Sequence, residues 1–152
     1  MAQNELVFAP LGGIGEIGMN LSIYGFGDDR RQWIIIDCGV SFASEEHLPG
    51  VDLILPDIRY LIEERKNILA LVLTHGHEDH MGALIDLWPR LKVPIHATPF
   101  TAALFEARRA SEPGAPEIPV QVVALGGGKF SVDHLLARRS AGPADHALQP
   151  AR

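Results

Sequence analysis

A dense cluster of residue types that bind metals lies in the middle of the chain. The cluster places His75, His77, Asp79 and His80 within six residues, just after the apolar run 68–73. Side chains two apart on an extended strand end project to the same side, so His75 and His77 can hold one ion. If the chain then curls, Asp79 and His80 face a second position. Imidazole and carboxylate ligands suit Zn²⁺ best, with Mn²⁺ and Fe²⁺ as the alternatives.

A second candidate for the site, Asp37, directly follows another apolar run. Asp37 and Cys38 follow the residues 33–36, and if the two runs form parallel neighbouring strands, Asp37 lies at the same sheet edge as His75. Asp37 would then orient a ligand histidine without binding the metal itself. A strand-end Asx turn is an equally good interpretation of Asp37. We do not expect Cys38 to act as a nucleophile, because an apolar strand end raises a thiol pKa and no base is placed for it.

The glycine-rich segment 13–18 matches the G-x-G-x-x-G fingerprint of dinucleotide-binding folds. That fingerprint requires a helix directly after its glycines, because the helix N-terminus binds the pyrophosphate. Residues 19–31 instead alternate in polarity and are interrupted by Gly25 and Gly27, which favours a hairpin. The segment is therefore predicted to be a loop between two strands.

The elements that must position these residues alternate along the chain. Strands are predicted at 6–9, 21–24, 33–36, 68–73, 93–95 and 120–125, helices at 57–66, at 84–91 and from a Thr98 cap to Arg109, and a surface excursion at 39–56. A hairpin followed by alternating strands and helices indicates an α/β fold, a sandwich with a mixed sheet.

The composition narrows the class of protein. A chain of 152 residues with 47% hydrophobic and 21% charged residues has the make-up of one globular domain, which excludes disorder and fibres. No apolar stretch approaches the roughly 20 residues that cross a bilayer, and a single cysteine agrees with a reducing compartment. We therefore expect a cytoplasmic protein with no membrane partner. The net charge of -6 argues against nucleic-acid binding by surface charge alone.

Three segments resemble the ribonuclease J family, in the β-CASP branch of the metallo-β-lactamase superfamily. They are LGGIGEIGMN at 11–20, DCGVSF at 37–42 and LTHGHEDHMG at 73–82, and the likeness covers about residues 5–132. The resemblance implies a metallo-β-lactamase-like αββα sandwich with a mixed sheet, of which the chain holds the N-terminal half only. It also implies two zinc ions in a complete site, one on His75 and His77 and the other on Asp79 and His80.

The same resemblance implies an activity, the hydrolysis of RNA phosphodiester bonds by 5′-to-3′ exonuclease and endonuclease action. Asp79 would also have a catalytic role by orienting the attacking hydroxide, and the ions would supply the positive charge that an acidic protein needs to process RNA. RNA is then the expected partner, with a homo-oligomer or a full-length enzyme as further candidates. The alternatives are another hydrolase of this fold, acting on esters, thioesters or lactones, and a non-catalytic metal-binding module.

The last 20 residues differ from the rest, since 133–152 contain no Val, Ile, Thr, Phe, Tyr or Trp. We predict a partial metallo-β-lactamase domain at 1–132 and a disordered, non-family tail after it. The family's third histidine ligand is not recognisable: His146 falls near its place without the motif, and His134 fits less well. We expect a truncated or frame-shifted family member, weak or inactive alone. His96 is predicted to be structural, and His47 is assigned no role.

Overall fold

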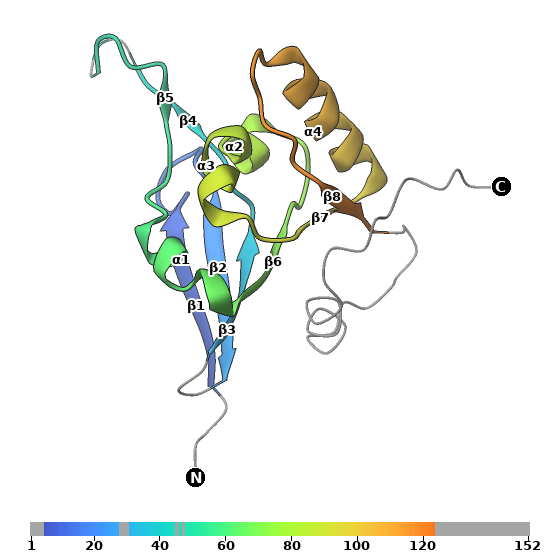
Figure 1. The fold of residues 1–152 in the computed structure, drawn as a ribbon. Coiled ribbons are helices and arrows are strands. Elements are labelled where there is room, and N and C mark those ends of the chain that lie inside the picture. The colour runs from blue at the N-terminus through green and yellow to red at the C-terminus, as the bar shows by residue number, and fades with distance from the viewer. Residues whose placement is uncertain (1–4, 28–30, 45, 47, 124–152) are drawn as a thin grey trace, which may run out of the picture.

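The fold was obtained as a computed structural model, which describes residues 5–27, 31–44, 46 and 48–123 (Figure 1). The elements in chain order are β1 (Glu5–Gly12), β2 (Leu21–Gly27), β3 (Gln32–Ile36), β4 (Ser41–Phe42), β5 (Leu53–Ile54), α1 (Arg59–Glu63), the 3-10 turn η1 (Arg65–Asn67), β6 (Ile68–Val72), α2 (Glu78–Met81), α3 (Leu84–Leu91), β7 (Ile95–Ala97), α4 (Pro99–Ser111) and β8 (Val120–Val122). Six strands form one sheet in the order β1-β2-β3-β6-β7-β8, and β4 pairs with β5 in a separate small sheet.

The six-stranded sheet is mixed. Strands β1, β2 and β3 are antiparallel, whereas β3, β6, β7 and β8 run parallel to one another. Trp33 lies opposite Ile68 and Ile36 opposite Val72, so β3 and β6 end at the same edge of the sheet. This topology confirms the mixed α/β sheet and the hairpin predicted after the glycine-rich loop. The helix that a dinucleotide fingerprint requires there is replaced by strand β2.

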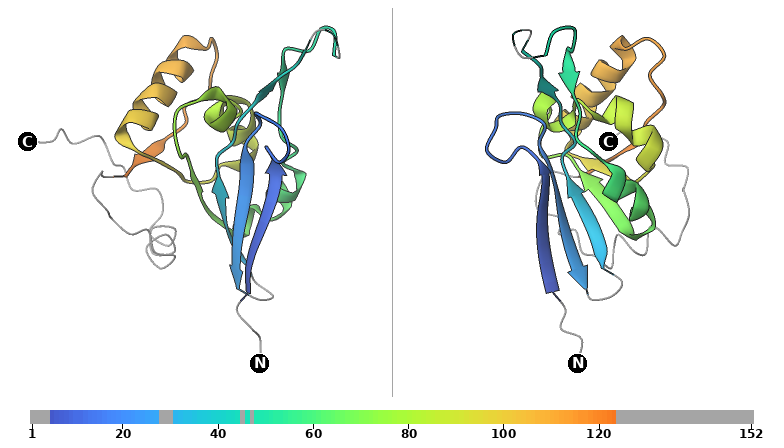
Figure 2. Two further views of the ribbon diagram at one scale, coloured as in Figure 1. Left: turned by 180° about the vertical axis from the view of Figure 1, so that it is seen from behind. Right: turned by 90° about the vertical axis from the view of Figure 1, so that its left-hand side faces the viewer.

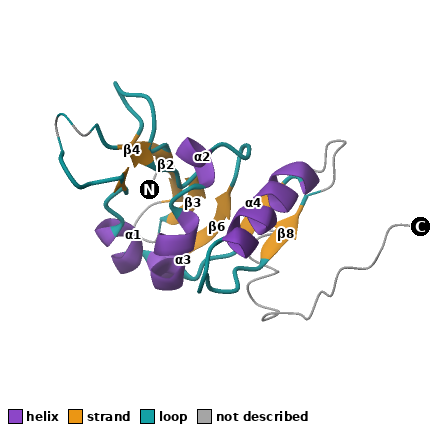
Figure 3. Ribbon diagram, turned by 90° about the horizontal axis from the view of Figure 1, so that it is seen from above, coloured by secondary structure: helices purple, strands orange, loops and turns teal. Residues whose placement is uncertain are grey.

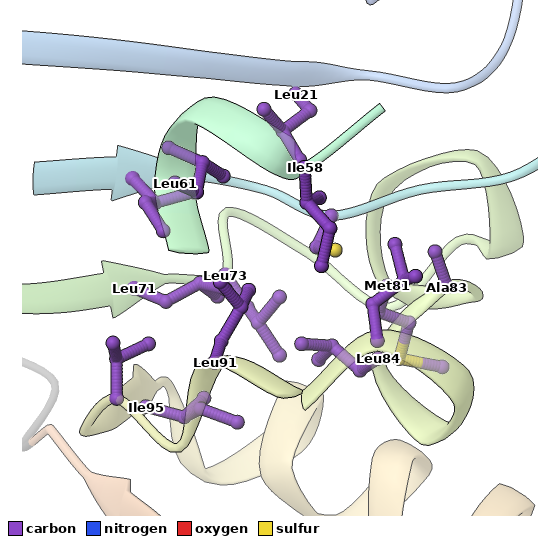
Figure 4. Packing of buried hydrophobic residues seen from close by; sticks show 14 of the residues in the cluster. Leu21, Ile58, Leu61, Leu71, Leu73, Met81, Ala83, Leu84, Leu91 and Ile95 are labelled. Carbon is purple, nitrogen blue, oxygen red and sulfur yellow. The ribbon is translucent and has the colours of Figure 1, made fainter. Parts of the chain in front are cut away.

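The helices α1, α3 and α4 lie on one face of the sheet (Figures 2 and 3). Their apolar sides pack on the strands in a core that includes Leu61 of α1, Leu71 of β6, and Leu84 and Leu91 of α3, all fully buried (Figure 4). Burying one such side chain stabilises a protein by roughly 1.5–3 kcal/mol. This packing therefore holds β6 in place, and the candidate ligands follow the end of that strand.

Three expected segments differ from the structure. The predicted surface excursion at 39–56 contains the hairpin of β4 and β5, whose strands have only two residues each and therefore show no period in the sequence. The predicted helix at 57–66 is divided into α1 and η1. The continuous apolar residues 33–36 are typical of a strand buried on both faces, but in β3 Ile34 and Ile36 are only half-buried.

Helix α4 begins as the sequence predicts. The Thr98 side chain accepts a hydrogen bond from the main-chain N–H of Thr101, and Pro99 is the first helical residue, where its missing N–H has no partner to lose. The helix continues past the predicted end at Arg109 to Ser111. Its start is therefore determined by a local capping signal.

In the part of the chain that the structure describes, no helix is long and apolar enough to cross a membrane. Several expectations fall outside the described residues: the boundary at 132, the tail at 133–152, and the histidines His47, His134 and His146.

Candidate metal centre

The candidate ligands lie beyond the carboxyl ends of β3 and β6. Asp37 follows β3, while Thr74 and His75 follow β6. The main-chain N–H of Asp37 donates to the carbonyl oxygen of Val72 at 2.9 Å, which continues the pairing of the two strands to their ends. Because parallel strands end at one edge, the two polar positions that the sequence indicates meet there.

The turn after β3 packs against helix α2 through main-chain hydrogen bonds. The N–H of Cys38 donates to the carbonyl oxygen of His80 at 2.7 Å, and the Cys38 carbonyl accepts from the N–H of Ala83 at 3.0 Å. Gly39 makes this approach possible, because a Cβ atom there would lie 1.7 Å from the carbonyl oxygen of Asp79. The backbone that carries Asp79 and His80 is therefore fixed to the turn that carries Asp37.

Asp37 is a buried carboxylate at the base of the centre, with 6% of its side chain exposed. Its Oδ1 accepts from the N–H of Thr74 at 2.8 Å, its Oδ2 lies 2.8 Å from Thr74 Oγ1, and Oδ2 is 2.7 Å from Nδ1 of His80. A carboxylate only accepts, so Nδ1 of His80 donates to Asp37, which leaves Nε2 as the nitrogen that can bind a metal. Asp37 thus has the contacts needed to orient a ligand histidine. Its φ of 63° is one that aspartate tolerates better than most residues.

Thr74 extends this network to His75, since its Oγ1 lies 3.0 Å from Nδ1 of His75. The single hydroxyl hydrogen of Thr74 points to the Asp37 carboxylate, so Oγ1 accepts from Nδ1–H of His75. The lone pair of His75 is then on Nε2. Asp37 therefore sets the tautomers of two histidines, that of His80 directly and that of His75 through Thr74.

The four predicted ligands come together as two pairs of donor atoms. Nε2 of His75 lies 3.2 Å from Nδ1 of His77. Two nitrogen atoms bound to one tetrahedral zinc ion at about 2.0–2.1 Å are about 3.4 Å apart. Oδ2 of Asp79 lies 3.5 Å from Nε2 of His80, and the rings of His75 and His80 have centroids 3.9 Å apart. The two pairs therefore lie side by side.

These donors fit zinc in their chemistry and spacing, two for each position. Within residues 5–123, apart from the few that are not described, no group of three or more His, Cys, Asp or Glu side chains is arranged to hold one ion. Catalytic zinc sites take three protein ligands. Each position therefore needs a further donor to form a complete site.

Helix α4 supports this segment from the other side. Nε of Arg108 donates to Oε1 of Glu78 at 3.0 Å, and Nη1 donates to Oε2 of Glu112 at 2.7 Å. The hydrogen bond to Glu112 is the main reason that the pKa of Arg108 is raised. Leu104 of the same helix lies against Gly76, where a Cβ atom would be 2.5 Å from its Cδ1. A larger residue at Gly76 would therefore displace Leu104.

Two other residues that the sequence singled out, Cys38 and His96, are buried. Burial, and secondarily the charge of Asp37, raises the pKa of the Cys38 thiol to about 12, so the thiol stays protonated. This agrees with the expectation that Cys38 is not a nucleophile. His96 is buried in β7, as expected for a structural histidine.

Sequence reasoning assigned no role to Thr74 and Asn20, which lie in the centre. The side-chain nitrogen of Asn20 is 3.1 Å from both the main-chain oxygen and Oδ2 of Asp79, and 3.2 Å from Nε2 of His80. The only signal for Thr74 is that it lies between a strand and a ligand motif. Asn20 is 59 residues from Asp79, and no spacing rule connects them.

Comparisons with known proteins show the family of the chain. The family model described as the metallo-beta-lactamase superfamily matches residues 22–149. Ribonuclease J of Sinorhizobium meliloti is 58% identical over an alignment of 139 residues, which covers 88% of this chain and 24% of that protein. Ribonuclease J of Thermus thermophilus is 43% identical over 111 residues, covering 70% of this chain and 19% of that protein. The chain thus spans about a quarter or less of the length of these relatives.

A solved structure, a metallo-beta-lactamase from Pontibacter korlensis, also resembles the chain. It has a TM-score of 0.40 and 18% sequence identity, and the match covers 86% of this chain and 56% of that one.

Proposed function

Since the chain belongs to the metallo-β-lactamase superfamily and is homologous to part of ribonuclease J, we propose that it provides a zinc centre for the hydrolysis of RNA phosphodiester bonds. The observation that carries the metal centre is the 3.2 Å separation between Nε2 of His75 and Nδ1 of His77, next to the pair formed by Asp79 and His80. We propose RNA as the substrate because these relatives are named ribonuclease J.

In this proposal His75 and His77 hold one ion, and Asp79 and His80 hold the other. When bound, the ions supply Lewis-acid polarisation and positive charge beside an anionic substrate. Asp79 has 31% of its side chain exposed, so its carboxylate can accept a hydrogen bond from the attacking water and orient it. Mn²⁺ and Fe²⁺ are the alternative metals.

Asp37 and Thr74 have a supporting role in the proposal. They keep the Nδ1 protons of His80 and His75 on the side away from the ions, so that both Nε2 lone pairs face the metal positions. This arrangement is needed before any ion can bind, because a histidine ligates only through an unprotonated nitrogen.

We expect little or no turnover by the chain alone, because the described residues offer two ligands to each ion rather than three. The candidate partners that would complete the centre are a second copy of the chain and a full-length enzyme. Because RNA is the proposed substrate, we also propose that the protein works in the cytoplasm.

Zinc content tests the metal centre. The purified chain is loaded with zinc, dialysed and measured for bound metal, alone and as the variants His77→Ala and His47→Ala. We expect His77→Ala to retain less zinc, because one of the two nitrogens at the first position is removed, and His47→Ala to match the unsubstituted chain. Equal zinc content in His77→Ala and the unsubstituted chain would reject the site.

Turnover tests the substrate. We expect the zinc-loaded protein, where active, to release 5′-mononucleotides from 5′-monophosphorylated RNA. Hydrolysis of an ester, thioester or lactone without RNA cleavage would assign the centre to another class of hydrolase in the superfamily. Zinc binding without any turnover, even after addition of a full-length enzyme whose own centre is inactivated, would favour the non-catalytic module.

A further inference from the structure

The side chain of Asn20 connects the glycine-rich loop to the pair formed by Asp79 and His80. Its amide nitrogen lies 3.1 Å from the main-chain oxygen of Asp79, 3.1 Å from Oδ2 of Asp79 and 3.2 Å from Nε2 of His80. An amide nitrogen carries two hydrogens, and the two Asp79 oxygens accept them. No amide hydrogen is left for Nε2 of His80, 3.2 Å away, so its lone pair stays available to a metal.

Asn20 is itself held in place by the main chain on both sides. Its N–H donates to the carbonyl oxygen of Asp79 at 2.9 Å, and its carbonyl accepts from the N–H of Gly39 at 3.0 Å. The loop also closes on its side chain, since a Cβ atom on Gly13 would lie 2.4 Å from Oδ1 of Asn20. The amide group is therefore a fixed donor that loses little freedom when it makes its hydrogen bonds.

Asp79 depends on this donor for its orientation. Its side chain is 31% exposed, so a carboxylate without a partner is able to rotate into water. The Asn20 amide instead holds Oδ2 of Asp79 at 3.5 Å from Nε2 of His80, and Oδ2 keeps a second lone pair for an ion. A ligand pair held in this way binds an ion more tightly, because its ordering precedes binding.

This inference rests on the metal centre proposed above: we propose that Asn20 is a positioning residue that preorganises Asp79, beside His80, for the second ion. A purely structural role for Asn20 has a different consequence. Loss of a structural contact lowers the stability of the fold and leaves the ratio of the two zinc affinities unchanged. Loss of a positioning contact weakens the second ion alone, because the amide contacts Asp79 and His80 rather than His75 and His77.

Zinc titration of the metal-free chain against a competing chelator separates these roles. The affinities of both ions are measured in the unsubstituted chain, in Asn20→Ala and in Asn20→Leu, which keeps a similar volume without a donor. We expect the second ion to bind roughly 10- to 100-fold more weakly in both variants and the first to be unchanged. Asn67→Ala is the matched control, because Asn67 also donates to a carboxylate, Oε2 of Glu64 at 2.8 Å, before the opposite end of β6.

Equal or tighter binding of the second ion in the Asn20 variants would overturn this inference and leave the proposed function intact. So would an unsubstituted chain that binds one ion at His75 and His77 and none at the other pair. A chain that binds no zinc would reject the proposed function and this inference together.

Histidine ¹⁵N NMR of the metal-free protein gives a second measure, independent of zinc. We expect the Nε2 resonance of His80 to shift in the Asn20 variants, because the amide dipole 3.2 Å away is removed, and to stay in place in Asn67→Ala. Thermal unfolding identifies the variants that are folded, and Asn20→Leu carries the test if Asn20→Ala unfolds. An unchanged His80 resonance would count against the positioning role.

Discussion

Replacement of Asp37 by asparagine tests the hydrogen-bond network under the candidate metal centre. Asparagine keeps the size of the side chain and also tolerates the φ of 63°. The N–H of Thr74 requires an oxygen at the position of Oδ1, so the new NH₂ group takes the position of Oδ2, 2.7 Å from Nδ1 of His80. That group donates, which forces His80 to accept at Nδ1 and to carry its proton on Nε2.

The size of the effect follows from this change of tautomer. To bind zinc through Nε2, His80 has to move its proton back to Nδ1 and give up a favourable contact in the variant. A hydrogen bond to a charged group contributes about 1.5–3 kcal/mol, so we expect zinc to bind roughly 10- to 150-fold more weakly at that position. The free energy of unfolding should fall by only about 1 kcal/mol, less than the loss in zinc-binding free energy, because a neutral hydrogen bond replaces a charged one.

Three measurements check this prediction: histidine ¹⁵N NMR for the tautomer, chelator competition for zinc, and urea unfolding for stability. Asp57→Asn is the control, since it removes the same charge from an exposed carboxylate that pairs with Arg59. An Asp37→Asn protein that keeps the proton on Nδ1 of His80 and binds zinc as tightly as the unsubstituted chain would refute the reasoning.

Two further predictions concern the turn after β3. Gly39→Ala places a Cβ atom 1.7 Å from the carbonyl oxygen of Asp79, so we expect the free energy of unfolding in urea to fall by about 3 kcal/mol or more. Gly50→Ala, which meets no atom within 4 Å, should change it by only about 1 kcal/mol, and equal losses would contradict the close approach. The buried Cys38 thiol has its pKa raised from 9.0 to about 12, so its contribution to stability is complete below pH 9 and is lost above it. Above pH 9 the thiol of the unfolded chain ionises before that of the folded protein. The difference in the free energy of unfolding between the unsubstituted protein and Cys38→Ala should therefore shrink by up to about 1.4 kcal/mol per pH unit. An equal difference at every pH would rule this out.

Local patterns were sufficient to predict most elements. The apolar run that became β6 and the Thr98–Pro99 signal that starts α4 depend on neighbours within a few residues, and both are found in the structure. Alternation around Gly25 likewise predicted the hairpin of β2 and β3. These features are readable because side-chain alternation and helix capping act over one or two turns of chain.

Other features depend on contacts between distant segments. The pairing of Ser41 with Ile54 forms a hairpin from two-residue strands, which is too short for any periodic signal. The half-burial of Ile34 and Ile36 depends on which elements cover each face of the sheet, and β3 by itself does not reveal this.

The sequence by itself determined the set of donors and their order: four side chains of the right chemistry, His75, His77, Asp79 and His80, directly after a strand. The tertiary structure decided which atoms of these side chains face one another and which nitrogens carry protons. Asp37 reaches His80 across 43 residues because β3 and β6 are parallel and end together, and the loop after β1 brings Asn20 to the same place. A hydrogen bond acts over about 3 Å of space whatever the distance along the chain, so only the folded arrangement defines these partners.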